Sequence, residues 1–403
     1  MYCKAQIRKY LLLCILVVSV TVTAERPNIL IKNTTCITEC ICLSPKQVLC
    51  NTGGLKHIPT DQFPSTIEEL SLTKNNFSII PTDAFAGLSM LRKLSLNENN
   101  ISSIRPFAFR KLHRLRELSI QYTPLASIEN FSFAALQNVT VILLANNKIQ
   151  YIDGSSFAGS FNIKVIILSN NPLLTIRSNA FTGLTNVEGL ILPSGIRVIE
   201  QDAFKTLQNV GLLKLTFMDL SGLKPYTFRG LSYVHDLNIQ DSDLGIIDGD
   251  AFTGMSNILN LNLLNNKIDF IQRLNFTYDA AIQLFRFHGN HLLEAPRQPE
   301  DIILEVSAIS AIDNHFPCDC QAHNILDSDF VNGSSEEFQR HNYCLSPIKF
   351  NGKRMNLIDF DSIAKCYDNV VKDNLGSGVI ALFHPPLLLI MFLSIKNVFL
   401  ECH

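Results

Sequence analysis

A nine-residue pattern, LxxLxLxxN, recurs along most of this chain at a nearly constant interval. Its first apolar position returns every 24 residues, with a single interval of 23. Copies begin at Ile67, Leu91, Leu115, Val139, Ile163, Val187, Val210, Val234, Ile258, Ile282 and Val306. A period of this length supplies one short strand and one return segment, and a single unit cannot bury its own apolar side. The pattern therefore predicts an elongated α/β solenoid whose stacked repeats share one continuous core.

A phenylalanine lies eighteen residues after the start of most repeats, and one residue earlier in the short repeat. The series is Phe85, Phe109, Phe133, Phe157, Phe181, Phe204, Phe228, Phe252 and Phe276. Because each ring belongs to the same position of successive repeats, we expect the rings to stack into a buried column. Repeat ten departs from the series, with Glu300 at this position.

An asparagine closes the pattern in seven repeats: Asn75, Asn99, Asn147, Asn171, Asn266, Asn290 and Asn314. An asparagine amide can both donate to and accept from the backbone, and this residue tolerates the dihedral angles of turns. We expect these side chains to hydrogen-bond the turns of adjacent repeats, which is a structural role.

Eight of the eleven cysteines form two groups of four, one on each side of the repeats. They are Cys36, Cys40, Cys42 and Cys50, then Cys318, Cys320, Cys344 and Cys366. In an exported chain such compact even sets indicate disulfide-bonded caps, and three pairings per group are open. Alternatively, four thiols can bind a zinc ion, but an oxidising compartment disfavours such a site. We therefore expect caps over residues 25–66 and 314–366, with the repeats over 67–313 between them.

These features together resemble the extracellular leucine-rich-repeat family of cell-surface proteins, such as Toll-receptor ectodomains, Slit and connectin. The motifs are the spacing Cys36-x3-Cys40-x-Cys42-x7-Cys50, the repeats with their phenylalanine, and Asn314-His-Phe-Pro-Cys318-Asp-Cys320. The resemblance extends from about Cys36 to Cys366, although the tryptophans common in the family's C-terminal cap are missing. It implies a curved horseshoe with a parallel concave sheet. It also implies that Cys36 pairs with Cys42, Cys40 with Cys50, Cys318 with Cys344, and Cys320 with Cys366.

Both ends of the chain carry features of the secretory pathway. Residues 1–24 combine a basic start, an apolar stretch and a small-residue cleavage site, which predicts a signal peptide. Near the other end, an apolar tail over 379–403 follows a stalk over 367–378 that contains Gly376 and Ser377. This layout predicts a glycolipid anchor at Gly376 or Ser377, with a single-pass helix as the alternative. Either anchor places the protein on the extracellular face of the plasma membrane.

Outward positions of the strands, the third, fifth and seventh of each repeat, are polar in repeats one to three and eight to ten. In repeats four to seven they are largely apolar: Val141, Leu143, Ala145, Val165, Ile167, Ile191 and Leu212, with Phe217 at a strand end. An apolar island with polar surroundings predicts a protein interface. The alternatives are the preference of strands for β-branched residues, and burial under a loop or under a second copy of the chain in a homodimer.

Glycosylation sequons occur at Asn33, Asn76, Asn100, Asn130, Asn138, Asn275 and Asn332. A glycan shields its surroundings. None of these asparagines occupies an outward strand position, and none lies between Asn138 and Asn275, where most of the apolar island falls. Their distribution favours a partner surface there, although chance and family geometry also produce such gaps.

Several classes of function are disfavoured by the sequence. The formal net charge of -2 gives no basic surface for nucleic acid, and the common catalytic motifs HExxH, GxSxG, GxxxxGK[ST] and GxGxxG are not found. We expect no enzyme, no metal and no cofactor. The prediction is a cell-surface recognition or adhesion protein that binds an extracellular or cell-surface protein through its concave face. The alternatives are an innate-immune pattern-recognition co-receptor and a structural protein of the extracellular matrix.

Overall fold

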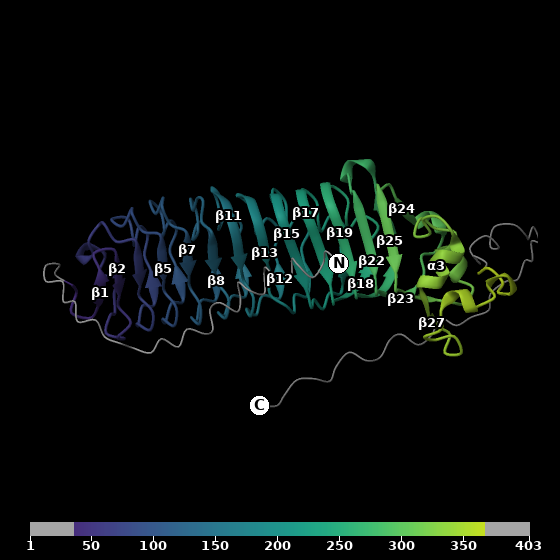
Figure 1. Cartoon of the computed structure of the whole chain (residues 1–403), viewed down its shortest axis with the longest axis horizontal. Helices are drawn as coiled ribbons and strands as arrows, with labels where there is room; N and C mark the ends of the chain where they lie inside the picture. Colours follow the sequence, from purple (N-terminus) through teal and green to yellow (C-terminus); the bar gives the residue numbers. More distant parts are fainter. Residues whose placement is uncertain (1–35, 367–403) are drawn as a thin grey trace, which may run out of the picture.

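The computed structural model describes residues 36–366 as a solenoid of parallel strands between two caps (Figure 1). Each repeat adds one strand to the main sheet, in chain order. The repeat strands are β3 (Glu69–Ser71), β5 (Lys93–Ser95), β7 (Glu117–Ser119), β9 (Val141–Leu143), β11 (Ser160–Ile167), β13 (Leu184–Ile191), β15 (Gln208–Thr216), β17 (Ser232–Gln240), β19 (Ser256–Leu264), β22 (Leu284–His288) and β25 (Ala308–Ile312). Parallel pairing in exact repeat register confirms the predicted solenoid.

The return segments contain short strands that pair on a second side of the solenoid. Along the first repeats, β4 (Ile79–Ile80) pairs with β6 (Ser103–Ile104), β8 (Ser127–Ile128) with β10 (Tyr151–Ile152), and β12 (Thr175–Ile176) with β14 (Val198–Ile199). A six-stranded sheet follows, made of β16 (Gly222–Leu223), β18 (Asp243–Ile247), β20 (Lys267–Ile271), β23 (His291–Glu294), β26 (His315–Pro317) and β27 (Tyr343–Ser346). Within residues 36–366, α-helix is confined to the C-terminal cap, as α2 (Ala322–Leu326) and α3 (Ser335–His341).

The predicted column of phenylalanines forms the core, because every ring of the series is buried. Face-to-face stacked neighbours, such as Phe85 with Phe109 and Phe228 with Phe252, have centroids 5.9 and 5.2 Å apart. Hydrogen-bonded strands are spaced by only about 4.8 Å. The ring column is therefore longer per repeat than the main sheet, and the solenoid curves with that sheet on its inner side.

The asparagines that close the pattern hydrogen-bond the backbone of two repeats at once. Asn99 is buried, and its amide nitrogen donates to the carbonyl oxygens of Leu72 at 2.8 Å and Leu96 at 2.9 Å. Asn147 does the same towards Ile120 and Leu144. Each side chain thus satisfies buried turn carbonyls that the sheet leaves without a partner. The structural role that we predicted for them is confirmed.

Repeat ten fills its core without a phenylalanine at position 300. Ile302 is buried, and the strand β24 (Ile302–Leu304) pairs in parallel with β21 (Leu274–Phe276). The column ends by turning, since Phe276 meets Phe285 edge-on at 5.1 Å with an interplanar angle of 80°. Aliphatic side chains two and four residues beyond Glu300 therefore replace the missing ring.

The two caps close the ends of the core and contain four disulfides. At the N-terminal end, β1 (Ile41–Ser44) runs antiparallel to β2 (Gln47–Leu49), which pairs with β3. The bonds join Cys36 to Cys42, Cys40 to Cys50, Cys318 to Cys344, and Cys320 to Cys366. These are the pairs that the family resemblance implies, and disulfides of this kind indicate a secreted or cell-surface protein.

Several predicted features lie outside the described residues, namely the signal peptide over 1–24, Asn33, the stalk and tail over 367–403, and the anchor candidates Gly376 and Ser377. Within residues 36–366, no helix has the length and apolar character needed to span a membrane.

A row of aromatic and basic side chains joins the last repeats to the C-terminal cap. The His291 and His315 rings are 4.4 Å apart, and His315 stacks on Tyr343 at 5.2 Å. The guanidinium of Arg354 covers the other side of the row, 5.5 Å from the Tyr343 ring. The Nδ1 atom of His315 is buried without a partner among the described residues. Burial, then the charge of His291, lowers the pKa of His315, with Asp313 acting in the opposite sense.

Acidification is therefore expected to destabilise the C-terminal cap. The pKa of His315 is lower in the folded chain than its ordinary value of 6.5, so the unfolded chain takes up the proton first. Stability is complete above about pH 6.5 and falls as the pH drops below it. Thermal unfolding between pH 7.5 and pH 5 should show the loss, and His315→Phe should reduce it. An unchanged acid dependence in His315→Phe contradicts the assignment to this side chain.

Candidate functional site

The apolar side chains predicted on the sheet face form two rows that cross four neighbouring strands, β9, β11, β13 and β15. The first row is Val141, Val165, Gly189 and Leu212. The second row is Leu143, Ile167, Ile191 and Lys214. We call the six apolar members, without Gly189 and Lys214, the apolar patch. Because the pairing is in exact register, paired side chains are immediate neighbours on one surface. The first row is interrupted at Gly189, which has no side chain between Val165 and Leu212.

The six side chains of the apolar patch are all half-buried, which leaves part of each accessible beside its neighbours. Ala145 differs from our prediction, because it is buried at 7% exposure and adds little to the surface. Its single methyl group is shorter than the side chains around it on the sheet. The patch therefore consists of larger aliphatic side chains in two rows.

Polar side chains border the apolar patch and bond to one another. On the side of the first repeats, Ser119 donates to Asn97 at 2.8 Å, and the hydroxyls of Thr73 and Ser95 are 3.0 Å apart. On the other side, Asn260 donates to Asp236 at 3.0 Å and Asn262 to Asn238 at 2.6 Å. The flanks thus satisfy their own polar groups, whereas the patch between them offers only apolar atoms. This arrangement matches the apolar centre and polar rim of a protein interface.

Phe217 follows β15 at the C-terminal edge of the sheet and is 62% exposed. Its φ angle is +53°, in the left-handed region that disfavours bulky residues. The corresponding residues of other repeats include Asn146, Asn170 and Asn265, which tolerate this conformation at lower cost. Phe217 thus places an exposed aromatic ring at a backbone position that disfavours bulky residues.

Tyr122 and Tyr233 are among the exposed aromatic residues that were not predicted from the sequence. Tyr122 has a φ of +57° at the position equivalent to Phe217, and Tyr233 has a φ of +55° just before its repeat begins. They are 62% and 59% exposed. Each tyrosine replaces an asparagine that occurs at the same position of other repeats, and the sequence shows this replacement. The replacement indicates an unusual residue only once the backbone at that position is known to be left-handed.

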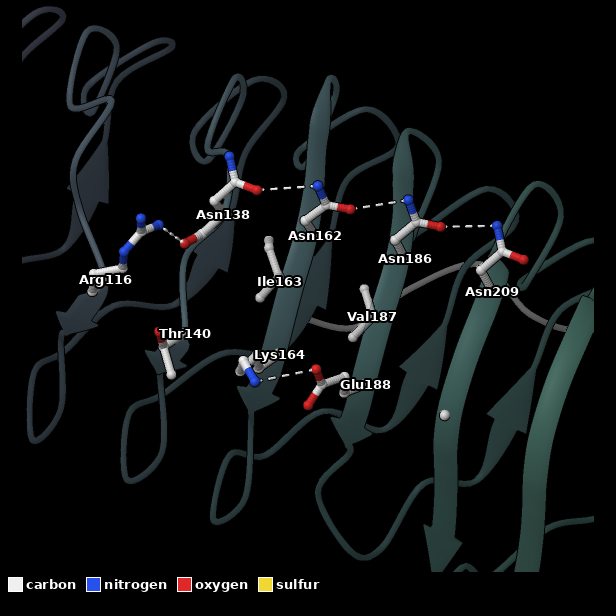
Figure 2. A pocket seen from close by; sticks show the side chains of 11 residues that line it. Arg116, Asn138, Thr140, Asn162, Ile163, Lys164, Asn186, Val187, Glu188 and Asn209 are labelled. Carbon is white, nitrogen blue, oxygen red and sulfur yellow. Dashed lines mark hydrogen bonds and ion pairs between the residues drawn. The ribbon is translucent and has the colours of Figure 1, made fainter.

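A groove of about 640 Å³ lies where β9, β11, β13 and β15 begin (Figure 2). Its rim carries a row of four side chains, the asparagine row, made of Asn138, Asn162, Asn186 and Asn209. Amide nitrogens donate along the row at 3.0, 3.0 and 2.8 Å. Lys164 and Glu188 form an ion pair at 3.4 Å below it. Of these four residues, only Asn138 was predicted as a site from the sequence, because it begins a sequon.

The sequon asparagines within the described residues differ in exposure. Asn76, Asn100, Asn130, Asn138 and Asn332 are exposed. Asn275 is half-buried in β21, and its Oδ1 atom is buried without a partner among the described residues. Glycosylation at all of these positions stays a prediction. Over residues 36–366, no group of three or more His, Cys, Asp or Glu side chains is placed to hold a metal ion.

Two family models match the repeats. The Leucine rich repeat model matches residues 65–125, 113–173 and 137–194, and the BspA type Leucine rich repeat region (6 copies) model matches 174–291. Together they cover residues 65–291, which is more than half of the chain. The chain belongs to the leucine-rich-repeat family. Its disulfide-bonded caps make it a leucine-rich-repeat protein of the extracellular kind.

Solved structures share the leucine-rich-repeat fold. The leucine-rich-repeat chain in an octameric complex of Latrophilin 3, Unc5D and FLRT2 matches with a TM-score of 0.52 and 18% identity, covering 81% of this chain and 98% of that one. A TLR13–ssRNA13 complex matches with a TM-score of 0.41 and 20% identity, covering 73% of this chain and 54% of that one. Human 5T4 matches with a TM-score of 0.40 and 19% identity, covering 83% and 99%. No curated protein matches this leucine-rich-repeat chain.

Proposed function

We propose that this leucine-rich-repeat protein is a cell-surface recognition or adhesion protein that binds another protein through the apolar patch. The observation that carries the proposal is the pair of in-register apolar rows on a sheet whose flanking polar groups bond to one another. Burial of aliphatic surface supplies most of the free energy in protein association. The patch is therefore the part of the sheet with the most to gain from a partner.

The shape of the sheet favours a different protein over a second copy of this chain. Because the main sheet lies on the inner side of the curve, two copies facing each other would touch at their rims before their patches met. A partner with a convex apolar surface can reach the patch directly. In the octameric complex, FLRT2, whose leucine-rich-repeat chain has a similar fold, is assembled with Latrophilin 3 and Unc5D.

Charged side chains at the ends of the rows add specificity. Glu117 on β7 is the strand neighbour of Val141 at one end of the first row, and Asp236 on β17 is the strand neighbour of Leu212 at the other. Lys214 ends the second row. A partner needs an apolar centre and groups at its periphery that complement these charges. Attachment through the predicted anchor at Gly376 or Ser377 would present this surface outside the cell.

The direct test is to display the soluble ectodomain, residues 25–376, against a library of cell-surface proteins. The proposal is supported if the ectodomain captures a partner and a variant of the apolar patch fails to bind that partner. A partner that binds patch variants and the unchanged ectodomain equally would overturn it. Sedimentation of the ectodomain alone tests the homodimer, which should be absent at micromolar concentration.

Phe217→Asn is expected to separate binding from stability. Asparagine accepts the left-handed conformation, so the free energy of unfolding should stay the same or rise by a few tenths of a kcal/mol up to about 1 kcal/mol. Partner affinity should fall by about tenfold or more, since an exposed aromatic anchor commonly contributes above 1 kcal/mol. Denaturation and binding measured on one preparation decide the matter. A variant that binds as before removes Phe217 from the interface.

A further inference from the structure

The asparagine row has a free amide nitrogen at only one end. Asn209 donates to Asn186, Asn186 to Asn162, and Asn162 to Asn138. The Asn138 nitrogen donates to no side chain or backbone atom among the described residues, and Figure 2 shows it directed away from Asn162. A sugar attached to the Asn138 nitrogen would therefore disturb no hydrogen bond of the row. On Asn162, Asn186 or Asn209, the sugar would share the nitrogen with the hydrogen bond that this atom donates.

The same asparagine is the only member of the row that begins a glycosylation sequon. Thr140 lies two residues after Asn138, whereas Lys164, Glu188 and Gly211 occupy that place after the other three. The left-handed φ of all four residues explains why asparagine recurs there. It does not explain why the sequon falls at the end of the row whose nitrogen is free.

The rest of Asn138 is held by its surroundings. Its backbone N–H donates to the carbonyl oxygen of Phe161 at 3.0 Å, and its own carbonyl oxygen accepts from the Arg116 guanidinium. The side-chain oxygen accepts from Asn162. The amide that would carry a sugar is thus fixed in position while its nitrogen stays exposed to solvent. Thr140 is exposed as well and lines the same groove.

We propose that Asn138 carries an N-linked glycan whose first sugar is held in a fixed orientation by the asparagine row. In the modification, a bond forms between Nδ2 and the sugar C1 atom as C1 leaves its diphosphate carrier, and Nδ2 loses a proton. The glycan stands at the end of the groove, beside the first strand of the apolar patch. Given the proposed function, it restricts a partner on that edge and leaves the opposite edge, with Phe217, open.

The test uses the soluble ectodomain secreted from animal cells, with glycopeptide mass spectrometry to measure occupancy at each sequon. A peptide N-glycosidase, which hydrolyses the glycosylated amide and leaves aspartate, then reports how freely each site is released. Release from native protein at Asn138 should be at least about tenfold slower than at Asn100, which is also exposed but lies outside the asparagine row. The two rates should become equal after denaturation. Neither readout depends on any partner, so failure here is separate from failure of the proposed function.

Two matched variants locate the cause. Asn162→Asp tolerates the left-handed conformation but cannot donate to Asn138, so release at Asn138 should accelerate by about fivefold, the equilibrium effect of one hydrogen bond. Asn209→Asp carries the same change of charge at the far end of the row and should leave that rate unchanged. An unoccupied Asn138, native release as fast as at Asn100, or equal effects of the two variants would each overturn the proposal.

Discussion

Glutamate at both Leu143 and Ile167 is expected to weaken partner binding by at least about 100-fold while the ectodomain stays folded. The two residues are neighbours across β9 and β11, so the variant places two like charges inside the apolar patch. Each loses an aliphatic contact of about 1.5 to 3 kcal/mol and adds a charge that the partner must desolvate. Together these effects correspond to two or more orders of magnitude in affinity.

The same variant should cost little stability, because both side chains point away from the core and are only half-buried. Repulsion between neighbouring strands contributes at most about 1 kcal/mol. A matched control is Ser71→Glu with Ser95→Glu, which places two charges at paired positions of the same row, outside the patch. The control should bind as the unchanged ectodomain does. Full binding by the Leu143 and Ile167 double variant would rule out the apolar patch as the site.

Phe133→Ala is expected to lower the free energy of unfolding by about 3 to 5 kcal/mol. The ring is fully buried, and its centroid is 5.6 Å from those of both Phe109 and Phe157. Its removal leaves a cavity between two rings that the flanking hydrogen-bonded strands prevent from closing. Chemical denaturation followed by circular dichroism measures the loss.

Phe131→Ala is the matched control, because the two phenylalanines are two residues apart and differ in burial. Phe131 is 39% exposed and stacks at the surface on Phe107 at 5.4 Å. Its loss should cost no more than about 1.5 kcal/mol, the contribution of one aromatic pair. Equal free energies of unfolding for Phe133→Ala and Phe131→Ala would contradict the assignment of the ring column as the stabilising core of the repeats.

The repeat made most of the architecture predictable. A side chain recurring at one position of every unit must lie against its own copies, so the ring column, the buried asparagines and the strand register followed from spacing alone. The apolar side chains also lay where alternation along the strands placed them. Leu143 and Ile167 were assigned to one face on that basis, and the strand pairing makes them neighbours.

Other features depend on backbone conformation, which spacing does not reveal. The left-handed turns at Asn138, Phe217 and Tyr233 decide which residues are strained and which side chains can meet. The asparagine row therefore became visible only with the structure. At repeat ten, Glu300 marked a departure, but the replacement by Ile302 arises from pairing between β21 and β24. The burial of Ala145 depends on the size of the side chains around it, which its position in the repeat does not reveal.

A stack in which each unit touches only its neighbours loosens from its ends inward. The strands β9 to β15 hold the fourth to seventh places among eleven, so several intact turns separate them from either terminus of the stack. Fraying that begins after loss of a cap disulfide must pass through those turns before it disturbs Leu143 or Ile167. Damage at the extremities, by reduction or proteolysis, should thus reach the binding surface last.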